Sequence, residues 1–239
     1  MDSILSFFVG EKVLYGAFKQ GESVYEDKLS IQDSYQSEAL VPFLSRLWQK
    51  ANNTPLTHII CPRGPASYTT IRISLSAAQG LKTAFPKAHI FAPSHFKVLA
   101  FASGLKQGTV LIDSQKGFYY GASFDNLKLD SPQVWEEDAI ENMPETFVVS
   151  SRPDYFRSKF KGNFVAPNSN LALCQIDLFE LEKSHLQPEE KTLSPLYIQN
   201  PVYRKKKQSM PEFLAHREKL KYKLELLIWG FYSGFSATI

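Results

Sequence analysis

The sequence has few of the residues that build disulfide frameworks and metal centres. Its only cysteines, Cys61 and Cys174, lie far apart and form no CxxC pair, which favours a reducing compartment over a disulfide framework or zinc site. Its five histidines form no HxxH, HxxxH or HExxH pair, the spacings that place two imidazoles on one helix face. These absences argue against a zinc or iron hydrolase, and we predict no metal ligand.

Long apolar runs and targeting signals are lacking as well. No stretch reaches the ~20 apolar residues that span a bilayer, and the opening MDSILSFF has an Asp where a secretory signal carries Lys or Arg. The net charge of +3 does not demand a nucleic-acid partner. We therefore expect a cytoplasmic protein with no membrane span.

Common catalytic and phosphate-binding motifs are also missing. There is no GxxxxGK[ST] loop, no GxGxxG fingerprint and no GxSxG elbow. Asp113, in LIDSQKG, ends a predicted strand, where both a phosphate-facing carboxylate and an Asx-turn are reasonable interpretations. The basic run RKKKQ at 204–208 suits either contact with nucleic-acid phosphates or a solvated linker.

What the chain does contain is a regular succession of α/β elements. SILSFFVG, KVLYGAF and SVYEDKLSI predict three strands, and QSEALVPFLSRLWQKA predicts a helix with Ser37 as its N-cap. Its apolar positions at helical spacing are Leu40, Phe43, Leu44 and Leu47. The order then continues with a strand at LTHIIC, a helix in the segment from 63, a strand at AHIFAP and a helix at HFKVLAFASG.

After Gly104 the chain starts a second α/β unit, so the boundary is placed near 103–108. GTVLIDS and FYYGASF predict a hairpin, ETFVVSS a strand and SRPDYFRSKF a short helix. The segment NSNLALCQIDLFELEK predicts a longer helix, capped by Asn168 or Ser169. Its predicted apolar face consists of Leu171, Cys174, Leu178 and Leu181.

The C-terminal part differs in character. A helical pattern over 211–228 places Phe213, Leu220, Leu224 and Leu227 at recurring positions, and the uncharged ending LLIWGFYSGFSATI is too short to span a membrane. We expect this ending to pack on the body of the protein or on a partner. Attachment to a membrane surface is the alternative.

The segment RGPASYTTIRISLSAAQGLK, 63–82, is dense in hydroxyls and small residues. Ser67 or Thr69 is expected either to cap a helix or to help hold an anion at its N-terminus. Thr70, Ser74 and Ala77 or Ala78 form a small-residue face, which suits the protein's own core or a helix pair between subunits.

This segment resembles the RGPGSFTGxRIGxxxAQGL signature of the bacterial TsaB (YeaZ) family. ILSFFVGEKVLYGAFKQGESV, VLIDSQKGFYYGASF and LSPLYIQNPVYRKK are similar to other segments of that family, so the resemblance covers about 4–207. It implies an α/β fold of the two-lobed actin/Hsp70/sugar-kinase type (ASKHA, ribonuclease H-like), with mixed β-sheets and flanking helices. The implied parts are an N-terminal lobe at 1–104, a C-terminal lobe at 105–208 and an extension at 209–239.

The resemblance also implies a function. TsaB-like proteins are non-catalytic scaffolding partners of the TsaD-type enzyme, which transfers a threonylcarbamoyl group to the adenosine beside the tRNA anticodon. A heterodimer with TsaD, a TsaE-type ATPase, tRNA reached through the complex and a homodimer without the partner are therefore expected. No cofactor is expected on this chain alone, and ATP or ADP is assigned to the complex interface.

The expected site residues follow from the signature and the basic run. The partner interface is expected to use Arg63, Gly64, Pro65, Ser67, Thr70, Arg72, Ser74, Ala77, Ala78 and Gly80. Asp113 is the candidate nucleotide-facing residue, and Arg204, Lys205, Lys206 and Lys207 are the candidate tRNA contacts. No catalytic residue is assigned.

The chain departs from the family pattern at three places. Phe8, Val9 and Gly10 stand where the family has Asp-Thr-Ser, and Gln36-Ser37-Glu38 stands where it has His-Thr-Gln or His-Ser-Glu. Three signature glycines are replaced by Ala66, Thr70 and Ser74. We expect no ATP hydrolysis by the isolated chain. A stand-alone acyl or carbamoyl transferase or peptidase of the same fold, and a drifted protein-interaction module, are the alternatives.

Overall fold

The computed structural model describes residues 2–10, 12–31, 35–114, 118–141, 147–150, 152–167 and 170–198. Residues 1–200 form one compact unit. The basic run Arg204–Lys207 and the extension 209–239 lie outside the described residues. The division into lobes at residue 104 stays a prediction.

The first sheet has five strands in the order β3-β2-β1-β4-β5. The three N-terminal strands form an antiparallel meander, and β4 and β5 run parallel to β1. This arrangement confirms the predicted run of three strands followed by alternating helices and strands. The strands are β1 (Ser3–Val9), β2 (Val13–Gln20), β3 (Ser23–Ser30), β4 (His58–Ile60) and β5 (His89–Phe91).

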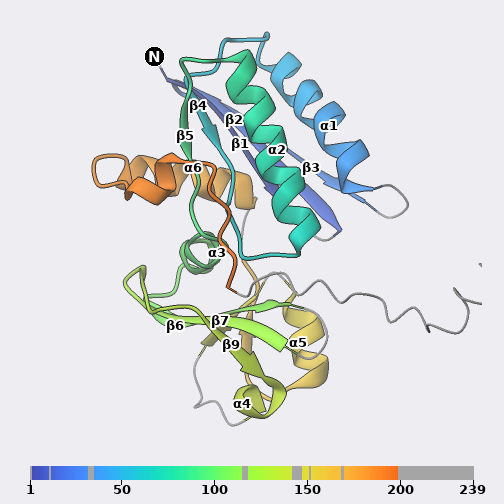
Figure 1. The fold of residues 1–239 in the computed structure, drawn as a ribbon, viewed down its shortest axis with the longest axis vertical. Coiled ribbons are helices and arrows are strands. Elements are labelled where there is room, and N and C mark those ends of the chain that lie inside the picture. The colour runs from blue at the N-terminus through green and yellow to red at the C-terminus, as the bar shows by residue number, and fades with distance from the viewer. Residues whose placement is uncertain are drawn as a thin grey trace, which may run out of the picture. The chain divides into compact units, whose positions relative to one another are not determined.

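Helices α1 (Gln36–Lys50) and α2 (Tyr68–Ala84) cover one face of this sheet (Figure 1). Alternate residues of a strand point to opposite faces, and Leu5, Phe7 and Val9 of β1 are buried in the cluster on this side. Leu40, Phe43, Leu44 and Leu47 of α1 join the same cluster, as their spacing predicted.

The opposite face of the sheet packs on α3 (His95–Ser103) and α6 (Leu171–Glu182). Ile4 and Phe8, the other side chains of β1, share one apolar cluster with Val110 and Ala122 of the second sheet. These two helices therefore lie between the sheets and join them into one core, so the end of β1 is positioned against the second sheet.

The second sheet has six strands, five in the order β11-β10-β6-β7-β8, with β9 paired to β7. The predicted hairpin is confirmed, since β6 and β7 pair antiparallel with Asp113 opposite Tyr119. A third cluster on its outer face includes Tyr119 and Phe156. The strands are β6 (Gln107–Asp113), β7 (Phe118–Asp125), β8 (Lys128–Leu129), β9 (Gln133–Glu136), β10 (Phe147–Val149) and β11 (Asn163–Val165). The remaining elements are α4 (Glu137–Glu141), α5 (Pro153–Lys159) and the 3₁₀ helix η1 (Pro188–Lys191).

Three local predictions need correction. Tyr35, not Ser37, occupies the N-cap position of α1, and it makes no side-chain cap bond. Asn170 caps α6 through its side-chain oxygen, whereas the predicted caps Asn168 and Ser169 lie outside the described residues. Leu181 is 62% exposed. Phe179, on the opposite side of the helix, supplies the apolar contacts of that turn against Phe91 and His58.

No helix within the described ranges is long and apolar enough to cross a bilayer.

Candidate functional site

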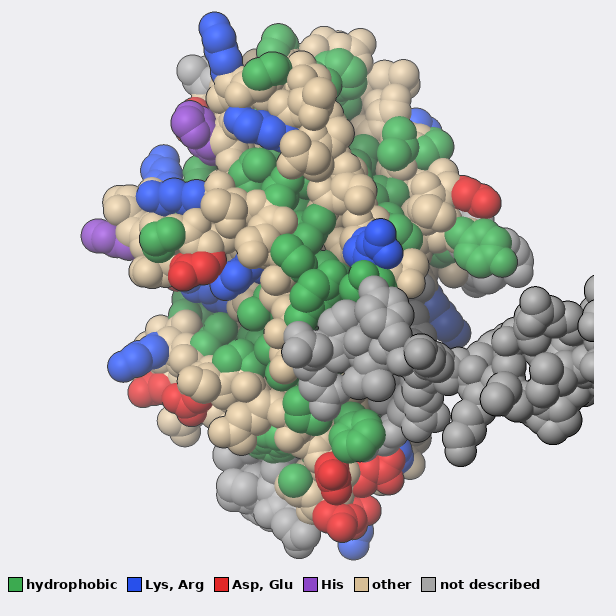
Figure 2. Space-filling view, in the orientation of Figure 1, with side chains coloured by type: hydrophobic (Ala, Val, Ile, Leu, Met, Phe, Trp, Pro, Cys, Tyr) green, Lys and Arg blue, Asp and Glu red, His purple; other side chains and the backbone are tan. Residues whose placement is uncertain are grey.

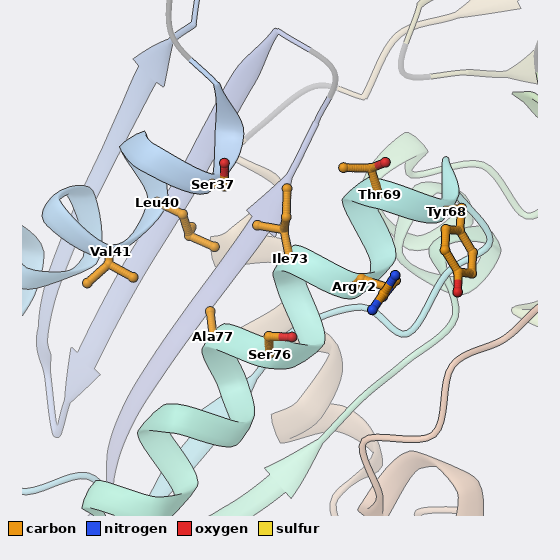
Figure 3. A pocket seen from close by; sticks show the side chains of 9 residues that line it. All are labelled: Ser37, Leu40, Val41, Tyr68, Thr69, Arg72, Ile73, Ser76 and Ala77. Atoms are coloured by element: carbon orange, nitrogen blue, oxygen red, sulfur yellow. The ribbon is translucent and has the colours of Figure 1, made fainter. Parts of the chain in front are cut away.

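A groove of about 520 Å³ runs between α1 and α2 on the outer face of the first sheet. Leu40 projects from α1 toward Ile73 of α2 (Figure 3). Val41 is 63% exposed, an unusual exposure for a large aliphatic side chain. Figure 2 shows hydrophobic side chains gathered on the face that carries these helices. The groove is lined by Ser37, Leu40, Val41, Tyr68, Thr69, Arg72, Ile73, Ser76 and Ala77.

One end of the groove is aromatic and cationic. The Arg72 guanidinium lies over the Tyr68 ring, 5.2 Å from its centroid, a favourable cation–π geometry. On the chain's C-terminal side, Tyr197 stacks on Tyr68 with ring centroids 5.7 Å apart. The groove therefore combines an apolar wall with one planar charged group, the composition that the centres of protein interfaces favour.

The hydroxyls at the start of α2 were expected either to cap the helix or to help hold an anion, and the structure shows a cap. The Ser67 hydroxyl accepts a hydrogen bond from the Thr70 backbone N–H at 3.1 Å, so Ser67 is the helix cap. It also donates to the Thr70 hydroxyl at 2.8 Å, which donates in turn to the Gln36 side-chain oxygen at 3.2 Å. The Gln36 amide donates to the Gly10 carbonyl at 2.7 Å. This chain of bonds links α2 to α1 and both to the end of β1.

The small-residue face of α2, which we expected to form part of the partner interface, is not a surface of the protein. Thr70, Ser74 and Ala78 are only 8%, 2% and 0% exposed, because this side of α2 faces the protein's own sheet. Their small side chains allow α2 to lie close to β1 and β4, the core alternative that the sequence left open.

The loop before α2 is internal as well. Gly64 and Pro65 are buried, so neither offers a contact surface. Gly64 has a φ of 109°, and a Cβ there would lie 2.9 Å from the Leu196 carbonyl oxygen. A glycine is therefore required by the fold at this position. Of the other predicted interface residues, Ser67, Arg72 and Gly80 are exposed, and Arg63 and Ala77 are half-exposed.

A second, smaller cavity of about 200 Å³ lies where β1, α2, α3 and β6 meet. It brings Asp113 into the same cleft as Ser67 and Thr70, residues far from it in the sequence. Asp113 pairs with Arg152, Nη1 to Oδ2 at 3.3 Å, and the Arg152 guanidinium lies 4.6 Å from the centroid of the Tyr155 ring. The cavity is below the ~300–1,000 Å³ typical of small-molecule sites.

His95 forms part of the cleft wall. Its Nδ1 donates to the Pro65 carbonyl, and its ring lies 4.6 Å from that of Phe8. Burial lowers the pKa of His95 to about 4, and the bond to Pro65 offsets this only in part. The imidazole is therefore neutral at pH 7, and Phe8, itself 3% exposed, fills the position next to it with an apolar ring.

Sequence reasoning missed several contributors to these sites. Val41 and Ile73 line the groove, and His95 and Arg152 line the cleft. Val41 had a usable signal, since it is a large apolar residue that does not belong to the buried set Leu40, Phe43, Leu44 and Leu47. The contribution of Arg152 depends on the packing of the second sheet, which no local pattern reports. Within the described residues, no group of three or more His, Cys, Asp or Glu could hold a metal ion.

Two mixed α/β sheets joined by α3 and α6 define the class of this fold. It is the ASKHA-like α/β fold, with flanking helices on mixed sheets. Among solved structures, the chain is similar to YeaZ from Pseudomonas aeruginosa, with a TM-score of 0.63 and 18% identity, over 82% of this chain and 100% of that one. It is similar also to a Pseudomonas aeruginosa protein described as having similarity to peptidase YeaZ, with a TM-score of 0.67 and 17% identity, over 83% and 100%. No family model matches the chain, and no curated protein matches it. The chain thus has the YeaZ (TsaB)-like fold.

Proposed function

We propose that this chain is a non-catalytic scaffolding partner of a TsaD-type enzyme, which threonylcarbamoylates the adenosine beside the tRNA anticodon. The YeaZ-like fold and the signature at 63–82 support this role. The observation that carries it is the apolar groove between α1 and α2, which is where the partner would bind.

The groove is suited to a helix of another protein. Two adjacent helices present Val41 and Ile73 along a channel, which is the arrangement used in helix-in-groove recognition. Arg72 at one end supplies an anchor of the kind enriched in interface hot spots. The hydrogen-bond chain through Thr70 and Gln36 fixes α1 and α2 before a partner arrives, which lowers the ordering cost of binding.

The cleft supports the non-catalytic part of the proposal. Its carboxylate, Asp113, is engaged by Arg152, and its imidazole donates to a backbone carbonyl. Phe8 lies where the family pattern has an acidic residue, so the charge that would hold a Mg²⁺–phosphate group is replaced by a buried ring. These groups stabilise the joint between the sheets.

The assembly implied by this role includes a TsaE-type ATPase and tRNA. ATP or ADP is assigned to the interface with the partner, and tRNA contact to Arg204–Lys207. In the absence of the partner, a homodimer through the same groove is expected.

The proposal is tested with Ser76→Trp, because Ser76 is exposed and lines the groove. Added bulk there should weaken binding to a purified TsaD-type subunit by about tenfold or more, the equivalent of ~1.4 kcal/mol. Ser184→Trp, at an exposed serine outside the groove, is the matched control. Equal affinities of the two variants, measured by titration calorimetry, would exclude the groove as the interface.

A cellular assay tests the function itself. The wild-type chain should restore threonylcarbamoyladenosine in the tRNA of cells that lack TsaB, and Ser76→Trp should restore less. Absence of the modified nucleoside despite normal expression of the wild-type chain would contradict the proposal.

A further inference from the structure

Two histidines face each other at one edge of the first sheet. Strands β4 and β5 lie side by side (Figure 1). His58 and His89 are their first residues, and they are direct neighbours in the register of this parallel pair. The centroids of the two imidazole rings are 5.6 Å apart. The spacings that the sequence lacks place two histidines on one helix, so a pair from neighbouring strands leaves no such signature.

One imidazole of the pair is held in place and the other is accessible. The His58 ring packs on Phe179 of α6, with ring centroids 4.9 Å apart, and its side chain is 16% exposed. His89 is exposed, on the last strand of the sheet. A ligand from solvent can therefore reach the pair through His89, while the orientation of His58 is set in advance by packing.

A short hydrogen-bond network determines which nitrogen of His58 carries the proton. The Thr57 hydroxyl donates to the Ser3 carbonyl at 3.1 Å, so its own proton is already engaged. The same hydroxyl lies 2.9 Å from Nδ1 of His58 and therefore accepts a hydrogen bond from that nitrogen. Nε2 is left with a free lone pair. Metal-binding histidines commonly donate their other ring N–H in this way, which fixes the ring and its tautomer.

The charges around His58 are compatible with a cation. Burial lowers the pKa of His58 below its usual value of about 6.5, so the imidazole is neutral at pH 7. Oδ1 of Asp2 lies 4.0 Å from Nδ1 of His58, and this carboxylate favours a positive charge nearby. Lys183 acts on the same imidazole with the opposite sign. The pair therefore has one neighbour that would strengthen cation binding and one that would weaken it.

We propose that His58 and His89 together bind a divalent transition-metal ion, Zn²⁺ or an ion of similar chemistry, through Nε2 of His58 and one ring nitrogen of His89. Imidazole is a ligand that suits such ions. With metal–nitrogen bonds of ~2.1 Å, two imidazoles on one tetrahedral ion have ring centroids about 5–6 Å apart, which matches the observed separation. No third His, Cys, Asp or Glu of the described residues completes a metal-binding group, so water fills the other positions.

A bound ion would join β5 to β4. Strand β5 has only three residues and is hydrogen-bonded on one side, because it ends the sheet. The ion binds both histidines only when the two strands are paired, so it stabilises the folded state over the unfolded one. Zn²⁺ should therefore raise the melting temperature of the protein. This site is independent of the proposed function.

Calorimetric titration of the full chain with ZnCl₂ tests the site. His89→Gln removes one ligand at an exposed position and should weaken Zn²⁺ binding by about tenfold or more, the equivalent of ~1.4 kcal/mol. His58→Gln should weaken it as much, and the double variant no further, because each change breaks the same chelate. His185→Gln, at an exposed histidine outside the pair, is the matched control and should bind Zn²⁺ like the wild-type chain.

Two further measurements separate a shared ion from nonspecific binding. Lys183→Gln removes the opposing positive charge and should tighten Zn²⁺ binding. ZnCl₂ should raise the melting temperature of the wild-type and His185→Gln proteins, but not that of His89→Gln. Equal affinities of the wild-type and His89→Gln chains would overturn the proposal. Zn²⁺ binding that occurs only with formation of a dimer, as seen by light scattering, would overturn it as well, because the ion would then join two molecules.

Discussion

His95 donates a hydrogen bond from Nδ1 to the Pro65 carbonyl and packs its ring against Phe8, so one imidazole contacts two sides of the cleft. Pro65 belongs to the loop before α2, and Phe8 belongs to β1. The contacts therefore tie the beginning of α3 to two of the segments that border the cleft.

The buried imidazole predicts acid sensitivity. The pKa of His95 is about 4 in the fold, below the ~6.5 of an unfolded histidine. Below about pH 6.5, His95 binds a proton in the unfolded state but stays neutral in the folded state. The free energy of unfolding therefore falls as the pH drops from about 6.5 to 4. The full loss is roughly 3 kcal/mol, and urea unfolding at pH 7.5 and 5 measures its onset.

His95→Asn keeps an amide donor near the position of Nδ1 and should reduce this pH dependence. His185→Asn, at an exposed histidine, is the control variant. Burial lowers the pKa of His58 in the same direction, and both variants retain that contribution. Parallel pH curves for His95→Asn and the wild-type chain would show that His95 is not responsible.

The two serines of α2 should respond oppositely to the same substitution. Ser74 is 2% exposed against the protein's own sheet, so Ser74→Trp should destabilise the free protein by about 3 kcal/mol or more through overpacking. Ser76→Trp should change stability by less than about 0.5 kcal/mol because Ser76 is exposed. Circular dichroism during urea unfolding distinguishes them. If the Ser74→Trp protein is as stable as the wild type, the small-residue face of α2 is exposed rather than packed on the sheet.

Gly80 offers a stabilising change. A Cβ at this helical position meets nothing within 4 Å, so Gly80→Ala should raise the free energy of unfolding by about 0.5–1 kcal/mol through helix propensity. Gly16→Ala is the contrasting variant, because its Cβ would lie 2.8 Å from Cε1 of Phe43. It should lower stability. Melting temperatures that move in the same direction for both variants would contradict the packing described for these sites.

The basic run predicts a salt effect on tRNA binding. Replacing Arg204, Lys205, Lys206 and Lys207 by Ala should weaken tRNA binding by the assembled complex and flatten its dependence on salt concentration. A variant with the same change of net charge, in which the exposed Lys87, Lys128, Lys161 and Lys183 become Ala, is the control. If the two salt slopes are equal, the run is a solvated linker.

The sequence predicted the fold well because its signals were periodic. The spacing of Leu40, Phe43, Leu44 and Leu47 reports burial directly, and it was confirmed. The cap at Ser67 was also recognisable, since its bond is local to one turn.

The groove was harder to predict because a small-residue face on a helix is compatible both with packing in the core and with binding a partner. Thr70, Ser74 and Ala78 favour close approach equally to a sheet and to a partner helix, and only the position of α2 over β1 and β4 decides between them. Local spacing is likewise silent on Val41 and Ile73 as neighbours, because they come from different helices. Their meeting is a property of the tertiary structure.

The hydrogen bonds from Ser67 through Thr70 and Gln36 to Gly10 connect the cleft to the two helices that form the groove. All four residues line the cleft, while the bond between Thr70 and Gln36 holds the two helices of the groove at a fixed spacing. The two cavities are therefore not independent compartments. A ligand that widens the cleft would strain the same hydrogen bonds that hold the helices of the groove. By thermodynamic linkage, binding in the groove would affect the cleft to the same extent.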